Sequence, residues 1–316
     1  MKLICLMPAR NEDWVIGLSA RAALMWCDAL VVMLHRTSDR SEEILHSVIQ
    51  DTDEDCGPGP GGLGRFINRR VVILEDFSEH WREMAIRQKL LEVGRALGGT
   101  HFALVDADEV LTGDLLLRIR HLVEHTSAGS ILMLPWLCMK GEHTDYAEFS
   151  DGVQAVMSSG MWNEQRASTA FPDNSVYHWA ARATYDFHHR HPMGRDLQWY
   201  SPIEDRSSGL MHLQFASRRR LLAKQFLYQL IEVTRWPRRR PVSEVRDMYA
   251  RTVNEAASAS VERVPDSWWA PYSHLMQYLH VDAEPWQESE CKRLIAEHPG
   301  ITAGLDDFGL MKEWGM

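Results

Sequence analysis

Cysteine is scarce and dispersed in this sequence of 316 residues. The five cysteines never stand in CxxC spacing, and they are Cys5, Cys27, Cys56, Cys138 and Cys291. An odd and scattered set argues against a disulfide framework and against a structural zinc knuckle. We therefore expect a cytoplasmic location, and peripheral attachment to a membrane stays open.

Long hydrophobic runs are also missing. No stretch approaches the 18 consecutive apolar residues that predict a membrane-spanning helix. The N-terminus, MKLICLMPARNED, turns charged after a short apolar run and lacks the cleavage site of a signal peptide. These absences predict a chain without a transmembrane segment.

The sequence has no surplus of positive charge. It holds 34 Lys and Arg against 44 Asp and Glu, which gives a formal net charge of −10. Proteins that coat nucleic acids need a basic surface, so this class is disfavoured. Two local basic stretches, Arg218–Arg220 and Arg235–Arg240, run against the overall charge. Whether they bind an anion or form a solvated face stays open.

Three common nucleotide or hydrolase motifs are absent. No GxGxxG follows the first apolar run, and neither GxxxxGK[ST] nor GxSxG occurs anywhere. Dinucleotide-binding, P-loop and α/β-hydrolase interpretations therefore lose their defining feature.

What the sequence does contain is an alternation of short apolar runs with helical patterns. Strands are predicted over Lys2–Met7, Ala29–Leu34, Val71–Leu74, His101–Val105 and Ile131–Leu134, and helices over Glu12–Trp26, Ser41–Gln50 and Trp81–Leu97. The acidic and then Gly/Pro-rich segment Asp51–Gly64 predicts a loop. Buried strands that alternate with helices predict an α/β fold whose mostly parallel sheet is covered on both faces.

Polar segments follow three of these strands. Because ligands of parallel sheets bind beyond the carboxyl ends of the strands, Pro8–Asp13, His35–Asp39 and Asp106–Glu109 should converge on one crevice. From Leu221 onward the pattern is helical. We therefore divide the chain into a catalytic domain over 1–215 and a helical region over 216–316, which would serve the acceptor side or oligomerisation.

The segment Asp106-Ala107-Asp108-Glu109 is the clearest chemical signal. Two carboxylates at positions i and i+2, directly after a buried strand, can both face a ligand. Such hard oxygen donors suit Mg²⁺ or Mn²⁺, which neutralise a diphosphate. The alternative is a loop in which Asp108 and Glu109 cap the helix around Leu115–Val123.

Taken together, the motifs resemble those of family-2 nucleotide-sugar glycosyltransferases, which have the GT-A fold. The matching residues are Pro8-Ala9-Arg10-Asn11-Glu12, Ser38-Asp39, Arg87, Val105-Asp106-Ala107-Asp108-Glu109 and His212, with the basic helix that follows it. The resemblance covers about residues 1–230. It differs after the second strand, where Leu34 and His35 stand in place of the Asp residues that contact the base in many members.

The resemblance implies a role for each matching residue. Asp108 and His212 would hold the metal, with Asp106 contacting the ribose or sugar or joining the metal ligands. The nucleotide pocket would be lined by Pro8, Arg10, Asn11, Glu12, His35, Asp39, Arg87 and Asp106. A divalent cation, Mn²⁺ or Mg²⁺, would stabilise the charge that develops on the leaving nucleotide.

An inverting transfer also needs a general base for the acceptor hydroxyl. In the family this base is a carboxylate after the metal motif, and Asp205, with Glu204 next to it, matches best. Trp199 and Tyr200 precede this pair and could stack on a sugar ring. Asp173 and Asp151 are weaker candidates. For the run His188-His189-Arg190-His191, we expect a phosphate or acceptor contact from Arg190 or from the nearby Arg195 rather than a structural metal site.

The sequence thus predicts a metal-dependent glycosyltransferase that moves a sugar from a nucleotide-diphosphate sugar, first of all a UDP-sugar, to an acceptor hydroxyl. The acceptor could be a glycan, a lipid-linked saccharide, a small molecule, a protein or a modified nucleic-acid base. Two alternatives stay open: a sugar nucleotidyltransferase, and a non-catalytic relative that binds a nucleotide or a sugar.

Overall fold

The computed structural model describes residues 1–51, 66–67, 71–141, 155–159 and 165–316. Residues 52–64 of the predicted loop and the candidate base Asp151 lie outside the described residues. The chain divides into two compact units. The first comprises Met1–Leu137, Gln165–His212 and Pro265–His280, and the second comprises Cys138–Glu164, Leu213–Val264 and Val281–Met316. The second unit includes most of the predicted helical region, whereas residues 265–280 belong to the first.

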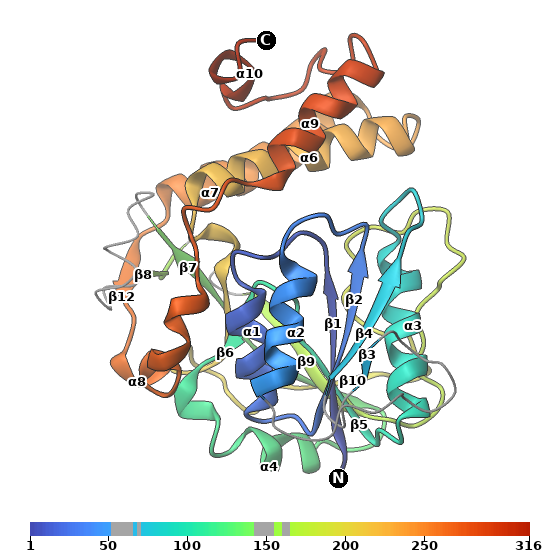
Figure 1. Ribbon diagram of the computed structural model, residues 1–316, viewed down its shortest axis with the longest axis vertical. Coiled ribbons are helices and arrows are strands. Elements are labelled where there is room, and N and C mark those ends of the chain that lie inside the picture. The colour runs from blue at the N-terminus through green and yellow to red at the C-terminus, as the bar shows by residue number, and fades with distance from the viewer. Residues whose placement is uncertain (52–65, 68–70, 142–154, 160–164) are drawn as a thin grey trace. The chain divides into compact units, whose positions relative to one another are not determined.

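Strands and helices alternate along most of the first unit (Figure 1). Its strands are β1 (Leu3–Ala9), β2 (Ala29–His35), β3 (Phe66–Ile67), β4 (Val71–Asp76), β5 (His101–Leu104), β6 (Glu109–Leu111), most of β7 (Ser130–Lys140), β9 (Arg166–Pro172), β10 (Gln198–Tyr200) and β11 (Leu210–His212). Its helices are α1 (Ile16–Leu24), α2 (Ser41–Asp51), α3 (Glu83–Ala96), α4 (Ile119–Glu124) and α8 (Asp266–Trp269), with short 3₁₀ turns at Gly113–Leu115 and Ala270–Tyr278.

The sheet of the first unit runs in the order β7-β9-β5-β1-β2-β4-β3. Its centre, β5-β1-β2-β4, is parallel, whereas β9 pairs antiparallel with both β5 and β7, and β3 pairs antiparallel with β4. The predicted α/β class, with a parallel central sheet flanked by helices, is confirmed. The carboxyl ends of β5, β1 and β2 therefore meet at one edge of the sheet, as predicted.

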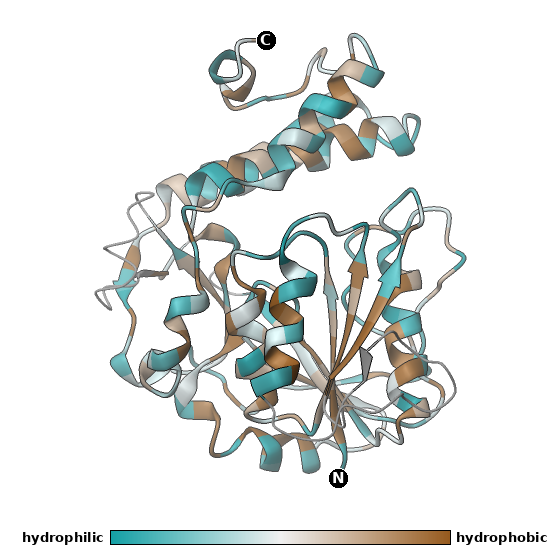
Figure 2. Cartoon of the chain, viewed as in Figure 1, coloured by the Kyte–Doolittle hydropathy of each residue, from teal (hydrophilic) through white to brown (hydrophobic). Residues whose placement is uncertain are grey.

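Alternate side chains of β1 enter two different cores. Leu3, Cys5 and Met7 pack with α1 and α2, whereas Ile4 and Leu6 pack with α3 on the other face. Because both faces of the central strands are covered, they have few polar residues, and β2 and most of β4 appear brown in Figure 2. The strand positions that sequence patterning predicts are thus explained by burial on both sides.

Helix α1 begins later than the sequence pattern predicts. Residues 12–15 form a turn in which the N–H groups of Val15 and Ile16 both donate to the Glu12 carbonyl. The N–H of Glu12 donates to Ser41 Oγ, and that of Asp13 donates to Asp39 Oδ2. Side chains after β2 therefore accept hydrogen bonds from the backbone N–H groups that precede α1.

A short antiparallel ladder follows the metal-motif segment. β6 pairs with β11 so that His212 lies opposite Glu109. Gly209 precedes β11, and a Cβ at this position would stand 2.3 Å from the Pro135 carbonyl oxygen. Only glycine lets the backbone approach β7 this closely, because any Cβ would clash with it. The approach holds β11 in place along β7, with His212 next to Asp108 and Glu109.

The second unit is mainly helical. It contains α6 (Arg218–Arg235), α7 (Val242–Ser258), α9 (Trp286–Glu297), α10 (Leu310–Glu313), a 3₁₀ turn at Leu213–Phe215, and a small antiparallel sheet of β12 (Val261–Arg263), β8 (Ala155–Met157) and the end of β7. Its core joins α6, α9 and the C-terminal residues through Phe226, Leu230 and Cys291. Within the described residues, no helix has the length and hydrophobicity that crossing a membrane requires.

Candidate functional site

Two turns at the ends of β1 and β2 are tied to each other. Asn11 has a left-handed backbone (φ 53°), which asparagine tolerates better than most residues. Its Oδ1 accepts from the N–H groups of Ser38 and Asp39 at 2.7 and 3.3 Å. Asp39 in turn accepts from Asp13 and from Ser41. The segments after β1 and β2 therefore form one rigid rim.

The structure brings the predicted nucleotide residues of these two strands together at this rim. Pro8 lies buried within β1, and Arg10 and Glu12 are half-buried beyond it. The carboxylate of Glu12 accepts from Trp14 Nε1 at 2.6 Å. Asn11 and Asp39 use their side chains to hold backbone N–H groups, so their observed role is to shape the rim.

His35 ends β2 as a fully buried residue. Its Nε2 donates to the Ser78 carbonyl at 3.0 Å, and its ring meets Trp81 edge to face. Nδ1 is buried and has no hydrogen-bond partner among the described residues. Burial, aided by the nearby Arg10 cation, lowers the pKa of His35 to about 4, so the ring is neutral at pH 7.

We expect this buried histidine to make folding weaker in acid. Between pH 6.5 and about 4 the unfolded chain binds a proton that the folded His35 does not, so stability rises with pH across that window. Its contribution amounts to about 3 kcal/mol between the two ends. Urea unfolding of wild type and His35→Gln at several pH values measures it as the difference between the two curves. His46→Gln, on the surface of α2, is the control. A difference that does not change with pH would contradict the prediction.

Asp106 is held between two buried arginines. Its Oδ1 accepts from Arg87 Nη2 at 2.9 Å, and its Oδ2 accepts from Arg190 Nη1 at 3.0 Å. Burial by itself would raise the pKa of Asp106, but the two guanidinium groups outweigh it and lower the pKa. Arg87 also bonds Glu83, while its Nη1 is buried without a hydrogen-bond partner among the described residues. That nitrogen is a donor left for a ligand.

Arg190 uses all five of its N–H donors inside the protein. Besides Asp106, it donates to Glu109 through Nη1 and Nη2, both at 2.8 Å, and to the carbonyls of Leu104 and Ser168. The predicted phosphate contact would require it to give up one of these bonds. The observed role of Arg190 is therefore to fix the turn from Asp106 to Glu109.

Glu109 is the fully buried partner in this turn. Burial raises the pKa of its carboxyl group, and the charge of Asp106 adds to the rise despite Arg190. Its oxygens nevertheless accept from Arg190, from Trp136 Nε1 at 2.8 Å and from the Asp106 N–H at 2.8 Å. With donors on both oxygens, the ionised form is the one that the structure satisfies. Glu109 begins β6 and does not cap a helix, so the alternative capping interpretation is wrong for this residue.

Asp108 and His212 are brought side by side by the β6–β11 ladder. The distance from Asp108 Oδ2 to His212 Nε2 is 3.5 Å, and both side chains are largely buried. Trp136 stacks on the His212 ring, with centroids 4.5 Å apart and planes 9° from parallel. Two ligands that bind one ion at about 2.1 Å lie about 3.0–3.4 Å apart, so this pair, at 3.5 Å, stands slightly wider than one bound divalent cation would hold it.

No group of three or more His, Cys, Asp or Glu side chains in the described part of the chain is arranged around a metal position. The Asp108–His212 pair therefore offers two protein donors. This number suits Mg²⁺ or Mn²⁺, because such ions commonly take one or two protein ligands and complete their shell with phosphate oxygens and water. Asp106 is less suited as a ligand, since both of its oxygens are bound by arginine.

The predicted bases lie on an exposed turn. Asp205 accepts from the N–H and Oγ of Ser207, which lowers the pKa of this carboxyl group. The carbonyl of Glu204 accepts from Arg166 at 2.9 Å. The weaker candidate, Asp173, forms an ion pair with Arg95 at 2.7 Å. The turn is thus anchored through its backbone, with the Glu204 and Asp205 side chains at the surface.

Sequence patterns missed most of the residues that support the site. Arg190 is 84 residues from Asp106, and Trp136 is 76 residues from His212. A loop also holds the start of α3: Asp186 accepts from the N–H of Met84 and Ala85. No spacing rule joins such distant positions. The histidine-rich run drew attention to Arg190, but as a phosphate or acceptor contact and not as the partner of Asp106 and Glu109.

The basic stretches of the second unit are largely paired. Arg219 bonds Glu288 at 2.9 Å, Arg240 bonds Glu244 at 2.9 Å, and Arg235 stacks on Trp236.

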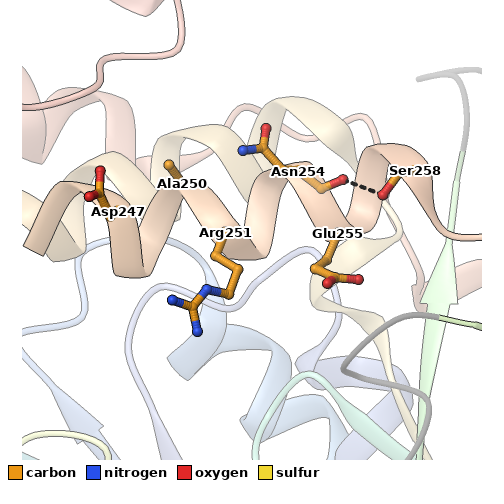
Figure 3. A pocket seen from close by; sticks show the side chains of 6 residues that line it. All are labelled: Asp247, Ala250, Arg251, Asn254, Glu255 and Ser258. Atoms are coloured by element: carbon orange, nitrogen blue, oxygen red, sulfur yellow. Dashed lines mark hydrogen bonds between the residues drawn. The ribbon is translucent and has the colours of Figure 1, made fainter. Parts of the chain in front are cut away.

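A shallow depression runs along α7, and Figure 3 shows that a single helix supplies its lining: Asp247, Ala250, Arg251, Asn254, Glu255 and Ser258. Its charges are of both signs and favour no ligand class.

Comparison with known proteins finds similarity at the level of structure. No family model matches the chain, and no curated protein matches it. Among solved structures, the chain is similar to S. aureus TarS, with 11% identity, 95% of this chain covered and a TM-score of 0.39. It spans about half of that TarS chain, 54%.

Two further solved structures are complexes with nucleotide sugars. One is the mannosyltransferase PcManGT from Pyrobaculum calidifontis with GDP-Man and Mn²⁺, with 12% identity, 99% of this chain and 79% of that chain covered, and a TM-score of 0.35. The other is a UDP-glucose pyrophosphorylase with UDP-glucose, with 14% identity, 50% and 67% covered, and a TM-score of 0.27.

Proposed function

We propose that this protein is a glycosyltransferase that moves a sugar from a nucleotide-diphosphate sugar to an acceptor hydroxyl. The observation that carries the proposal is the Asp108–His212 pair, 3.5 Å apart, next to an Asp106 that two arginines hold in place. Asp106 and Asp108 follow β5, and His212 ends β11. The carboxyl end of β5 lies beside the rim formed after β1 and β2. The Asp108–His212 pair would bind the cation that accompanies the diphosphate, and the rim after β1 and β2 would bind the nucleoside.

The donor nucleotide would lie along this rim. Arg10 and Glu12 reach it from β1, and the buried Arg87 Nη1 offers a donor to a phosphate or ribose oxygen. We infer that the donor is a UDP-sugar. Because Leu34 and His35 stand in place of the Asp residues that contact the base in many members of the family, the other bases are also tested. The cation, Mn²⁺ or Mg²⁺, would be held by Asp108 and His212, and when bound it would stabilise negative charge on the leaving diphosphate.

Transfer with inversion needs one carboxylate to accept the proton of the acceptor hydroxyl. We assign this role to Asp205, with Glu204 as the second choice. The hydrogen bonds from Ser207 lower the pKa of Asp205, which keeps the group ionised at neutral pH but makes it a weaker base. The same bonds hold one of its two oxygens, which leaves the other for the acceptor.

We expect Asp205→Asn to lower kcat by about 10²–10⁴-fold, because the amide cannot take up the proton. The nucleotide affinity should not change, since Asp205 is exposed and lies outside the rim. Transfer assays and nucleotide titrations measure the two effects separately. Glu204→Gln is the matched variant on the neighbouring position. If Asp205→Asn keeps full activity and Glu204→Gln loses it, the base is Glu204, and if neither loses activity, the base lies elsewhere.

The proposed function is tested by a thermal-shift panel of UDP, GDP, CDP, ADP and TDP and their sugars, each with and without Mn²⁺. A ligand that binds only the folded state stabilises it by about 2.7 kcal/mol at a hundredfold excess over Kd. A Mn²⁺-dependent shift with one nucleotide, together with release of that nucleotide from its sugar in the presence of an acceptor, supports the proposal.

Two other outcomes would replace it. Formation of a nucleotide sugar and pyrophosphate from a sugar phosphate and a nucleoside triphosphate would assign a nucleotidyltransferase. A shift without turnover of any sugar nucleotide would assign a non-catalytic binding protein. No shift with any nucleotide would contradict nucleotide binding itself.

A further inference from the structure

The turn that carries Glu204 and Asp205 is exposed in its middle and buried at both ends. Ile203 packs in the core of the first unit and Ser208 is buried, whereas the Glu204 and Asp205 side chains are open to solvent. Surface turns are commonly more mobile than the elements they connect. This one is instead bonded by two distant segments of the chain, one on each side of Asp205.

Arg166 holds the first half of the turn. This residue begins β9, and it donates from Nη1 to the Ile203 carbonyl at 2.6 Å and from Nη2 to the Glu204 carbonyl at 2.9 Å. The donors of a guanidinium lie in one rigid plane, so two such bonds restrict two successive peptide groups together. The backbone that leads into Asp205 is thus held in one conformation.

Trp268 holds the second half. Its side chain is buried, and its Nε1 donates to the Ser207 carbonyl at 3.0 Å. The N–H and Oγ of Ser207 donate in turn to the Asp205 carboxylate at 3.2 and 2.6 Å. The Ser208 hydroxyl donates to the Asp114 carboxylate, which fixes the end of the turn. Trp268 therefore acts on the Asp205 carboxylate through one intervening residue.

The indole of Trp268 is itself kept in place by the close packing of α8. A Cβ at Gly113 would stand 2.5 Å from Pro271 Cδ and 2.8 Å from the Ser267 carbonyl oxygen. Because Gly113 has no side chain, the backbone of α8 lies directly on the 3₁₀ turn at Gly113–Leu115. That 3₁₀ turn also contains Asp114, so both supports of the second half share one base of packed backbone.

The strand register places Arg166 at the edge of the sheet where the proposed donor site lies. β9 runs antiparallel to β5, with Ala170 opposite Ala103. Because β5 ends at Leu104, Arg166, which precedes Ala170 by four residues, lies past the carboxyl end of β5. It is therefore at the level of the Asp106–Glu109 turn, which follows β5.

The same stretch of β9 also supports the proposed metal ligand His212. The carbonyl of Gln165, next to Arg166, accepts from the N–H of Trp136 at 2.9 Å. Trp136 is the residue whose ring stacks on His212. Residues 165 and 166 therefore bond both the neighbour of His212 and the turn that carries the two carboxylates.

We propose that Arg166 and Trp268 are positioning residues, which hold the carboxylates of the Glu204–Asp205 turn in a fixed place beside the Asp108–His212 pair. The inference rests on the proposed glycosyltransferase function, in which this turn supplies the base for the acceptor hydroxyl. A base must stay within hydrogen-bond reach of that hydroxyl, and a misplacement of about 1 Å can cost about a hundredfold in rate. Both residues act through the backbone of the turn.

Arg166→Met and Trp268→Phe test the two supports, because each removes the N–H donors and keeps most of the side-chain volume. Nucleotide release is measured from the sugar nucleotide that gives the Mn²⁺-dependent shift, with water and with methyl glycosides as acceptors. We expect kcat to fall at least about tenfold in each variant, while Kd for the nucleotide with Mn²⁺ stays unchanged. Arg166→Lys should recover part of kcat, because an ammonium can still donate to a carbonyl.

The matched control is Arg120→Met. Arg120 is also partly exposed and donates to a backbone carbonyl, that of Trp26 at 2.9 Å, but this carbonyl precedes β2 at the opposite edge of the sheet. The variant should therefore keep the wild-type kcat. Circular dichroism and urea unfolding show which variants are folded. If Trp268→Phe does not fold, Arg166→Met alone decides.

A double variant separates positioning of the base from a general loss of structure. Once Asp205→Asn has removed the base, adding Arg166→Met should lower kcat no further, because no carboxylate is left to position. If Glu204 is the base, the same should hold for Glu204→Gln combined with Arg166→Met.

The outcomes separate the positioning role from the proposed function. Wild-type kcat in both single variants, losses that multiply in the double variant, or full activity of both Asp205→Asn and Glu204→Gln would each overturn the positioning role while the glycosyltransferase function stands. A wild-type protein that turns over no sugar nucleotide would contradict the proposed function and, with it, this inference.

Discussion

Asp108→Asn should abolish Mn²⁺-dependent nucleotide binding while the fold stays intact. The amide keeps the size of the side chain but loses the charge that a divalent cation would need from one of the two proposed protein ligands. The stabilisation by nucleotide and Mn²⁺, about 2.7 kcal/mol at a hundredfold excess over Kd in the wild type, should fall to near zero. His212→Ala should have the same effect, because it removes the other donor, 3.5 Å away.

The matched control is Asp196→Asn. Asp196 is an exposed carboxylate with a left-handed backbone (φ 57°), a conformation that asparagine adopts equally well. It should leave both the fold and nucleotide binding unchanged. Circular dichroism and unfolding without ligand show whether Asp108→Asn is folded. A folded Asp108→Asn that binds nucleotide with the normal Mn²⁺ dependence would show that the metal site lies elsewhere.

Arg190→Met should cause the largest loss of stability of any single change considered for the site. It leaves the fully buried Glu109 without the guanidinium that neutralises it, and it leaves the half-buried Asp106 with Arg87 alone. Breaking a buried ion pair from one side costs about 3–5 kcal/mol, because an uncompensated charge stays inside. Nucleotide binding should be lost as well, since the turn that presents Asp108 is no longer fixed. Urea unfolding and the nucleotide panel measure the two effects.

Two further variants show whether charge or shape is responsible. Arg190→Lys should recover little, because one ammonium cannot supply the five donors of a guanidinium in their fixed geometry. Arg190→Met combined with Glu109→Gln should regain part of the stability, since the buried charge is gone, while nucleotide binding stays lost. Arg195→Met, an exposed neighbour, should change stability by less than about 0.5 kcal/mol. If Arg190→Met were as stable as this control, the bonds from Arg190 to Asp106 and Glu109 would have no structural role.

Local patterns were enough to predict the frame of the site. The runs that became β1, β2, β4 and β5 are apolar on both faces, and this is a property that a parallel sheet covered by helices imposes on each strand separately. Since parallel strands end at one edge, the segments after them could be placed together without knowing any contact. The helix boundary at Ile16 was predicted less well, because side chains after β2 bond the N–H groups of Glu12 and Asp13.

Individual roles at the site were harder to predict than its position. Asp39 looked like a nucleotide contact, and in the structure its carboxylate holds the backbone of Asp13 and Ser41. His35 has the ring chemistry to meet a base, but the fold buries it against Ser78 and Trp81. Residue type and spacing indicate what a side chain can bind, whereas its neighbours decide which of those partners it has.

By itself, the sequence determined the α/β class, the edge of the sheet at which polar segments gather, and the pairing of carboxylates in the Asp106–Glu109 segment. The resemblance also paired Asp108 with His212, which the structure places 3.5 Å apart. Only the tertiary structure decided that Arg190 binds Asp106 and Glu109, and that Trp199 stands exposed beside His191. The reason is physical. Burial patterns repeat over a few residues and are written in each segment, but contacts between segments that are distant in the chain depend on strand order and register, which no single segment contains.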